Sequence, residues 1–185
     1  MDPKTQALTA VELLQPLVNN TSVDQLDNQT PCSEWKVRDL LNHVIGGGHM
    51  FAAGLRGDPV SGDGSADLVG DDHKASFQGA VDSLGAALEA TDDLNQIVVL
   101  PFGTMPAVIA LQVAAGDLLV HCWDLSQATG QSFDPPIEFV EASYGFFQMA
   151  VNDDMRAAGM FAPAVPAPDD APPLTKLLMF AGRQP

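Results

Sequence analysis

Apolar residues recur at every third or fourth position along most of this chain, which is the pattern of a helix that buries one face. Over residues 4–19, for example, Leu8, Val11, Leu14 and Val18 share a face. The same spacing predicts helices over residues 4–19, 37–45, 74–90, 105–129, 136–158 and 174–180. Long helices joined by short connections imply an α-helical bundle.

Two breaks in this pattern leave alternatives open. Pro16 either bends the first helix or ends it early. The run Gly46–Gly48 either ends the second helix near Ile45 or lies inside a helix that continues to Leu55. In the second case, the missing side chains would allow another helix or a ligand to approach closely.

Three segments fall outside the helical pattern. Residues 56–73 are rich in Gly and Asp and predict a loop, and residues 161–173, rich in Pro, Ala and Asp, predict an extended strap. The run Ile97–Leu100 is strand-like and predicts an extended connection or, at most, a small hairpin. We therefore expect an all-α fold with an extended Pro-rich C-terminal segment, and the length favours one domain over residues 1–185.

Composition narrows the classes of function. The chain carries 24 Asp and Glu against 8 Lys and Arg, a formal net charge of −16, so it should repel nucleic-acid phosphates and anionic membranes. No apolar run approaches the roughly 20 residues that span a bilayer, and the first residues do not resemble a signal peptide. Two cysteines fit a reducing compartment. We expect a cytoplasmic protein, monomer or homodimer, that binds a small-molecule substrate and neither nucleic acid nor membrane.

The long helix predicted at 105–129 carries three polar residues within an apolar sequence. At about 100° per residue, Asp117, His121 and Asp124 lie within roughly 60° of one another on one face. Asp117 and His121 are one turn apart, so a carboxylate oxygen and an imidazole nitrogen can share one divalent ion such as Zn, Ni, Fe or Mn. Asp124 can orient the imidazole by accepting its other N–H, or it is an ordinary exposed carboxylate.

His43 is a third candidate ligand, on the predicted helix over 37–45. Its helical face borders the apolar stripe, so it can complete a site with Asp117 and His121 if the two helices are neighbours. Three protein ligands and an open position are typical of catalytic metal sites. The competing interpretations are a chance acid–histidine pair and a hydrogen-bonded core histidine.

The remaining histidines and the cysteines offer weaker signals. His49 lies about 120° from His43 around the helix, so the two do not face one ion, and His73, beside acidic residues, predicts a solvated side chain. Cys122 needs no role beyond that of a small buried hydrophobe, and nothing near Cys32 in the sequence indicates a lowered pKa. The sequence also lacks the Gly-x-Ser-x-Gly elbow of serine hydrolases.

Two stretches of the chain resemble a known family. The segment TPCSEWKVRDLLNHV, residues 30–44, is similar to the opening signature of the mycothiol-dependent maleylpyruvate isomerase N-terminal family, within the DinB/YfiT-like group of metalloenzymes. The segment DLLVHCWDL, residues 117–125, is similar to its second signature. The C-terminal run VPAPDDAPP, residues 165–173, with Leu177-Leu178 and Gly182-Arg183 after it, resembles the close of an actinobacterial branch of the family.

This resemblance implies a DinB/YfiT-like four-helix bundle with a divalent metal at one end. The implied ligands are His43, Asp117 and His121, with zinc ahead of nickel, iron or manganese and mycothiol as a co-substrate. The isomerase uses Glu where this chain has the shorter Asp117. The isomerase also carries a second, C-terminal domain for which 185 residues leave no room, so we do not expect maleylpyruvate isomerisation itself.

Two classes of function remain open at this stage. The first is a metal-dependent transferase or isomerase that uses a low-molecular-weight thiol, with a metal-dependent hydrolase as a variant in which the ion activates water. The second is a non-catalytic bundle that binds a metal or a small ligand.

Overall fold

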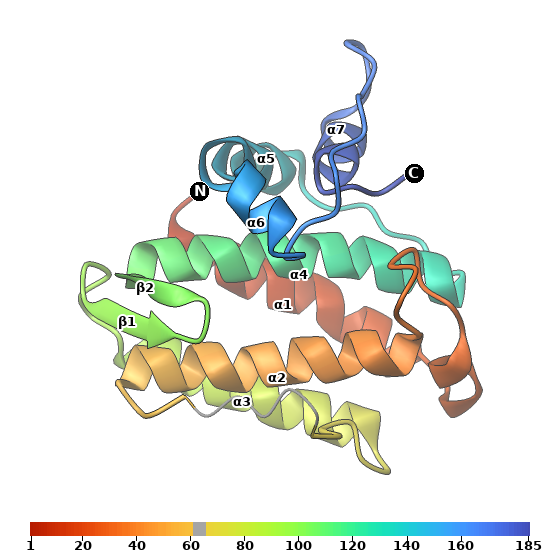
Figure 1. Cartoon of the computed structure of the whole chain (residues 1–185). Coiled ribbons are helices and arrows are strands. Elements are labelled where there is room, and N and C mark those ends of the chain that lie inside the picture. Colours follow the sequence, from red (N-terminus) through yellow and green to blue (C-terminus); the bar gives the residue numbers. More distant parts are fainter. Residues whose placement is uncertain (61–65) are drawn as a thin grey trace.

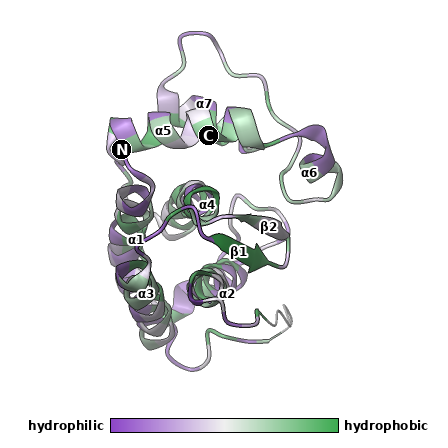
Figure 2. Cartoon of the chain, turned by 90° about the vertical axis from the view of Figure 1, so that its left-hand side faces the viewer, coloured by the Kyte–Doolittle hydropathy of each residue, from purple (hydrophilic) through white to green (hydrophobic). Residues whose placement is uncertain are grey.

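Four long helices lie side by side as a bundle in the computed structural model, which describes residues 1–60 and 66–185 (Figure 1). They are α1 Pro3–Asn20, α2 Val37–Arg56, α3 His73–Ala90 and α4 Ala107–Thr129. Seen along their axes, α1 lies beside α4 and α3 beside α2, with α2 also against α4 and α1 against α3 (Figure 2). The predicted all-α bundle is confirmed.

Both breaks in the apolar pattern lie inside continuous helices. α1 runs through Pro16 to Asn20, after which the short 3₁₀ helix η1 covers Val23–Asp27, and α2 runs through the three glycines to Arg56. A Cβ atom on Gly48 would lie only 3.1 Å from the Cβ of Ala80 on α3. This glycine therefore allows the close approach of α3, which was one of the two predicted alternatives.

A two-stranded antiparallel hairpin connects α3 to α4 along the chain and packs beside α2 and α4 (Figure 2). Its strands are β1 Ile97–Leu100 and β2 Gly103–Pro106, with Ile97 opposite Pro106. Leu100 is buried against the end of α2. The long helix predicted to begin near Met105 begins at Ala107, because Met105 and Pro106 still belong to β2.

The C-terminal third forms a layer over α4 (Figures 1 and 2). It contains α5 Ile137–Ala150, α6 Asp153–Ala157 and α7 Pro173–Phe180. The single helix predicted over 136–158 was wrong. Val151 has extended backbone and ends α5. Asn152 is extended too, and its side chain accepts a hydrogen bond from the Met155 backbone N–H at 3.0 Å, which caps α6. Residues 161–172 contain no helix or strand, as predicted for the strap.

The loop predicted at 56–73 lies partly outside the described residues, which omit 61–65. Its described flanks, 57–60 and 66–72, contain no helix or strand. Asn42 of α2 binds the second flank from both ends of its amide, donating to the Ala66 carbonyl at 3.0 Å and accepting from the Leu68 N–H at 2.6 Å. The 66–72 segment is thereby held against the first half of α2.

α4 is the central helix and packs against α1, α2, α5 and the hairpin. Among the described residues it is the one helix long and apolar enough to cross a membrane, so the sequence-based expectation of no such run was wrong. Its apolar character has a packing explanation, because 61% of that apolar stretch is buried inside the protein. The same helix carries Asp117, His121 and Asp124.

Candidate metal centre

The bundle brings His43, Asp117 and His121 together at the contact between α2 and α4. The Nε2 atom of His43 lies 3.0 Å from Oδ2 of Asp117, and the Nε2 atom of His121 lies 3.4 Å from Oδ1 of the same carboxylate. One carboxylate thus contacts both imidazoles, one through each oxygen. The two imidazole rings meet edge to face, with centroids 4.8 Å apart.

This cluster is open on one side. The side chains of His43 and Asp117 are each 39% exposed, whereas that of His121 is 6% exposed. The buried imidazole is therefore the inner wall of the cluster, and the other two residues form its rim. A ligand reaching the cluster from solvent would meet His43 and Asp117 first.

The opposite edge of His121 faces a closed, charged cluster. Its Nδ1 atom lies 3.1 Å from Oδ2 of Asp124, whose side chain is fully buried. The Arg183 guanidinium binds both oxygens of Asp124, from Nε at 3.0 Å and from Nη2 at 2.7 Å. The same Nη2 donates to Sγ of Cys32 at 2.9 Å. Asp124 is therefore not the exposed carboxylate that the sequence left as one alternative.

Trp35, in the segment that leads into α2, covers one face of the two histidines. Its ring stacks on His121 at 5.4 Å between centroids and 25° between planes, and it lies 4.9 Å from the ring of His43. The backbone of this segment is fixed by hydrogen bonds, including Thr30 N–H to the Trp35 carbonyl at 3.1 Å. The indole thus restricts how both imidazoles can rotate.

The charges of the cluster shift its pKa values in opposite directions. Burial by itself lowers the pKa of His121, but the charges and hydrogen bonds of Asp117 and Asp124 outweigh burial and raise it to about 9. Partial burial raises the pKa of Asp117, yet the two imidazoles hold it well below its usual range. The pKa of Asp124 is also lowered, because the hydrogen bonds of His121 and Arg183 outweigh its burial. At neutral pH both carboxylates are charged, and His121 is a cation with a proton on each ring nitrogen.

Two sets of donor atoms in this region are close enough to share an ion, and both include His121. One is His43, Asp117 and His121, and the other is Cys32, His121 and Asp124, each with donor atoms within 4.8 Å. The second set already holds the guanidinium of Arg183, so its charge is neutralised. The first combines two imidazoles and one carboxylate, a donor set that suits zinc and related divalent ions. The residues present therefore fit a divalent metal on the open side.

Residues 8–126 match the family model described as the mycothiol maleylpyruvate isomerase N-terminal domain. This chain belongs to that family. The family match includes all three donors of the open set and Asp124, whereas Arg183 lies beyond it.

Relatives of this family member have been identified both by sequence and by structure. Two uncharacterized proteins of Mycobacterium tuberculosis, MT0763 and Rv0738, are each 33% identical to it over 187 residues, covering 99% of this chain and 98% of the relative. The crystal structure of a histidine mutant of mycothiol-dependent maleylpyruvate isomerase matches it with a TM-score of 0.63 at 13% identity. That match covers 76% of this chain and 65% of the isomerase chain, and it shows the shared fold.

The other candidates from the sequence lie outside the cluster. His49 is exposed on α2, and Cys122 is fully buried. The solvated role predicted for His73 was wrong, because its side chain is buried and its Nε2 atom lies 3.1 Å from the Thr21 carbonyl, which makes it a hydrogen-bonded core histidine.

Sequence reasoning missed Arg183 and Trp35 and gave Cys32 no place in the cluster. A usable signal for Arg183 was its rarity, since it is one of only 8 basic residues and follows a Pro-rich segment. Trp35 and Cys32 both lie within the first family signature, and that position is the signal that could have identified them. Their contacts with α4 join residues about 90 positions apart.

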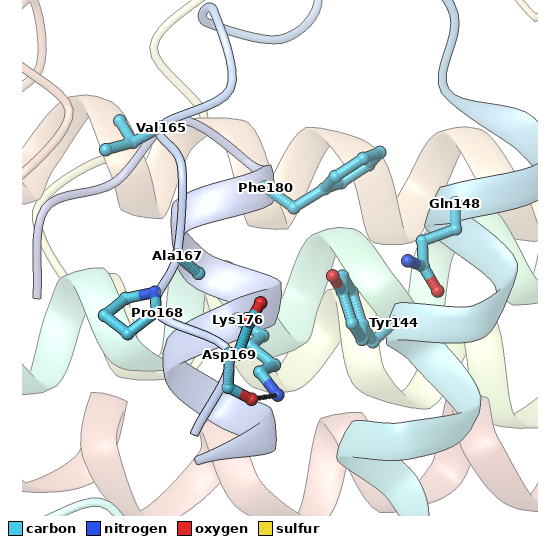
Figure 3. Close-up of a pocket in the computed structure, with 8 residues that line it drawn as sticks. All are labelled: Tyr144, Gln148, Val165, Ala167, Pro168, Asp169, Lys176 and Phe180. Carbon is cyan, nitrogen blue, oxygen red and sulfur yellow. Dashed lines mark hydrogen bonds between the residues drawn. The ribbon is translucent and has the colours of Figure 1, made fainter. Parts of the chain in front are cut away.

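Two surface pockets lie away from the cluster. One, of about 450 Å³, lies between α5, α7 and the strap, and its Lys176 ammonium is held by the Asp169 carbonyl at 2.5 Å (Figure 3). The other, of about 470 Å³, lies beside α1 and the segment after α4. Neither contains a histidine or a cysteine. The histidines, aspartates and cysteine whose side chains converge lie at the α2–α4 contact and not in these two pockets.

Proposed function

We propose that this family member is an enzyme that binds a divalent metal ion through His43, Asp117 and His121 and uses a low-molecular-weight thiol of the mycothiol type. The reaction class is a transfer or an isomerisation on a small electrophilic substrate. The observation that carries the proposal is the convergence of three good metal donors on one partly exposed point in a chain of this family. Zinc is the first choice of metal, ahead of nickel, iron and manganese.

The protein's own residues would hold and shape this site. His43, Asp117 and His121 would be the ligands, and the exposed rim formed by His43 and Asp117 would leave access for a small molecule. Trp35 would keep water from one face of both imidazoles. When bound, the ion would supply a Lewis acid that lowers the pKa of a coordinated thiol.

The chain's own thiols support the use of an external one. Burial raises the pKa of Cys32 to about 11, and the sulfur already accepts a hydrogen bond from Arg183. Burial also raises the pKa of Cys122, which has no exposed surface. Neither residue is a thiolate nucleophile at neutral pH. A thiol-dependent reaction would therefore take its sulfur from a small molecule.

Metal hydrolysis is a weaker candidate on the same residues. It would need a general base that faces the open side. Asp124 is the other carboxylate of the cluster, and it is buried with both oxygens bound to Arg183. It is therefore not placed to accept a proton from a water molecule on the rim.

The first experiment is metal analysis of the purified protein and of three variants. Wild type should retain one equivalent of a divalent ion, and His43→Ala and His121→Ala should lose it. His49→Ala is the matched control, because this exposed histidine lies on the same helix as His43 and should leave the metal content unchanged. Equal metal content in wild type and both ligand variants would overturn the metal-based proposal.

The second experiment tests the thiol on the metal-loaded protein. Mycothiol should raise the melting temperature, and its S-methylated form, which cannot become a thiolate, should not. An equal shift with both compounds, or none with either, would contradict use of the thiol sulfur and would leave a metal- or ligand-binding role in its place.

A further inference from the structure

The C-terminal end of the chain is joined to the candidate metal centre by a line of charged contacts. Arg183 binds both oxygens of Asp124, and Asp124 faces Nδ1 of His121 at 3.1 Å. The other ring nitrogen of His121, Nε2, faces Asp117. One imidazole thus links Arg183, at the far end of the sequence, to the open side of the cluster.

The contacts between Arg183, Asp124 and His121 are buried, and burial restricts the positions that these side chains can take. The side chain of Asp124 has no exposure and that of Arg183 is 12% exposed. Every nitrogen of the guanidinium has a partner, since Nη1 donates to the Ala181 carbonyl at 3.2 Å while Nε and Nη2 bind Asp124. Arg183 is consequently not free to bind a substrate, and its two parallel hydrogen bonds fix the plane of the Asp124 carboxylate.

The backbone before Arg183 is built to deliver it. Gly182 has φ of +85°, a left-handed conformation that glycine adopts without strain, and a Cβ atom there would lie 2.5 Å from the Cβ of Ala162 in the strap. The Arg183 N–H then bonds the Leu178 carbonyl at 2.8 Å, which ends α7 in a tight turn. The strap and α7 together place one guanidinium over one carboxylate.

We infer that Arg183 is a positioning residue for the metal ligand His121, acting through Asp124. By fixing the Asp124 carboxylate, it holds the Nδ1–H of His121 and orients the ring so that Nε2 faces Asp117 and the open side, where a metal ion would displace the proton on Nε2. A carboxylate behind a ligating histidine sets which ring nitrogen carries the proton and how the ring is oriented. This inference rests on the proposed metal site for its functional meaning, although its structural part holds for the metal-free protein.

The first test therefore uses the metal-free protein and NMR of its ¹⁵N-labelled histidines. Wild type should show a His121 Nδ1 proton protected from exchange with solvent. In Arg183→Gln, the Asp124 carboxylate loses its anchor, so this proton should exchange rapidly or disappear from the spectrum. Retention of the protected proton in Arg183→Gln would overturn the inference, whether or not the protein binds a metal.

A matched control separates positioning from simple docking of the C-terminal segment. Arg156 also holds α7, donating to the Phe180 carbonyl at 3.0 Å and lying 4.9 Å over the Phe180 ring, but it does not contact Asp124. Arg156→Gln should loosen α7 and leave the His121 proton protected. If Arg156→Gln and Arg183→Gln have the same effect on that proton, Arg183 acts only as a structural anchor and the inference fails.

The second test measures zinc affinity by competition with a chromophoric chelator. Arg183→Gln should weaken zinc binding about 10- to 100-fold, the usual cost of losing a partner behind a metal ligand. Arg183→Lys keeps the charge without the two-point contact and should fall between wild type and Arg183→Gln. This lysine variant also serves if Arg183→Gln fails to fold. Wild-type affinity in a folded Arg183→Lys would contradict the two-point requirement, and absence of zinc binding in wild type would refute the proposed function while leaving the NMR result to decide the inference.

Discussion

Two aspartates flank the same imidazole and have opposite environments. Asp117 is 39% exposed, and its carboxylate is balanced by a proton on His121 that dissociates with a pKa of about 9. Asp124 is fully buried, and its carboxylate is balanced by the permanently charged guanidinium of Arg183. Both aspartates lie on α4, two turns apart, and both have lowered pKa values.

The difference lies in whether the balancing cation can leave. On the Asp117 side the cation is a proton, which a metal ion can displace when it binds the same donors. On the Asp124 side the cation is covalently part of the chain and has little access to solvent. Asp117 therefore lies on the open side of His121, where the balancing cation can be exchanged. Asp124 lies on the closed side, where the fixed guanidinium holds His121 in place.

The largest expected effect is on the free energy of unfolding when the charge of Asp124 or of Asp117 is removed. Asp124→Asn leaves the Arg183 guanidinium buried without a counter-ion, so the free energy of unfolding of the metal-free protein should fall by about 3–5 kcal/mol. Asp117→Asn removes a partly exposed carboxylate and leaves no buried charge without a partner, so the free energy of unfolding should fall by less than in Asp124→Asn, while zinc binding should be lost. Urea unfolding and zinc titration of both variants measure the contrast. Similar losses of stability in the two would refute the division into an open and a closed side.

The pH dependence of stability provides a second test of the same division. Because folding raises the pKa of His121 from 6.5 to about 9, its contribution to stability is complete below pH 6.5 and is lost as pH rises through 9. The metal-free protein should therefore lose up to about 3 kcal/mol of unfolding free energy over that window. Urea unfolding of wild type against His121→Gln isolates this residue, since the variant should lack the decline. A stability that rises with pH in wild type relative to the variant would contradict a protonated His121.

The sequence carried enough information for the open side and much less for the closed side. Asp117 and His121 are one helical turn apart, so helix periodicity alone placed them on a common face. The apolar stripe beside His43 made that residue the third candidate, and the family resemblance implied the same three ligands. The remaining condition was that α2 and α4 be neighbours, and the packing of the four-helix bundle meets it. Local periodicity works here because every donor is presented by a regular helix, in which the spacing along the sequence fixes which residues share a face.

The closed side depends on a path that no local pattern encodes. Arg183 reaches Asp124 across 59 positions, through the break at Asn152, an irregular strap and the left-handed turn at Gly182. Each of these is a matter of tertiary packing or backbone conformation, where hydrophobic periodicity gives no signal. The prediction for His73 was wrong for a related reason. Its acidic neighbours in sequence indicated solvent, whereas the fold places it over the end of α1, where the Thr21 carbonyl accepts a hydrogen bond from its imidazole.

The smallest expected effect is on zinc affinity when Trp35 is replaced. Because its ring covers His43 and His121, this variant tests the open side of His121 separately from the closed side. Trp35→Ala removes an aromatic contact worth about 0.5–1.5 kcal/mol and lets both rings rotate, so zinc affinity should fall about 2- to 10-fold. Trp35→Phe keeps an aromatic face and should retain most of the affinity. The Nδ1 proton of His121 should stay protected in both variants, because Asp124 and Arg183 hold it from the closed side. Loss of that protection in Trp35→Phe would mean that the indole, and not the buried ion pair, sets the orientation of His121.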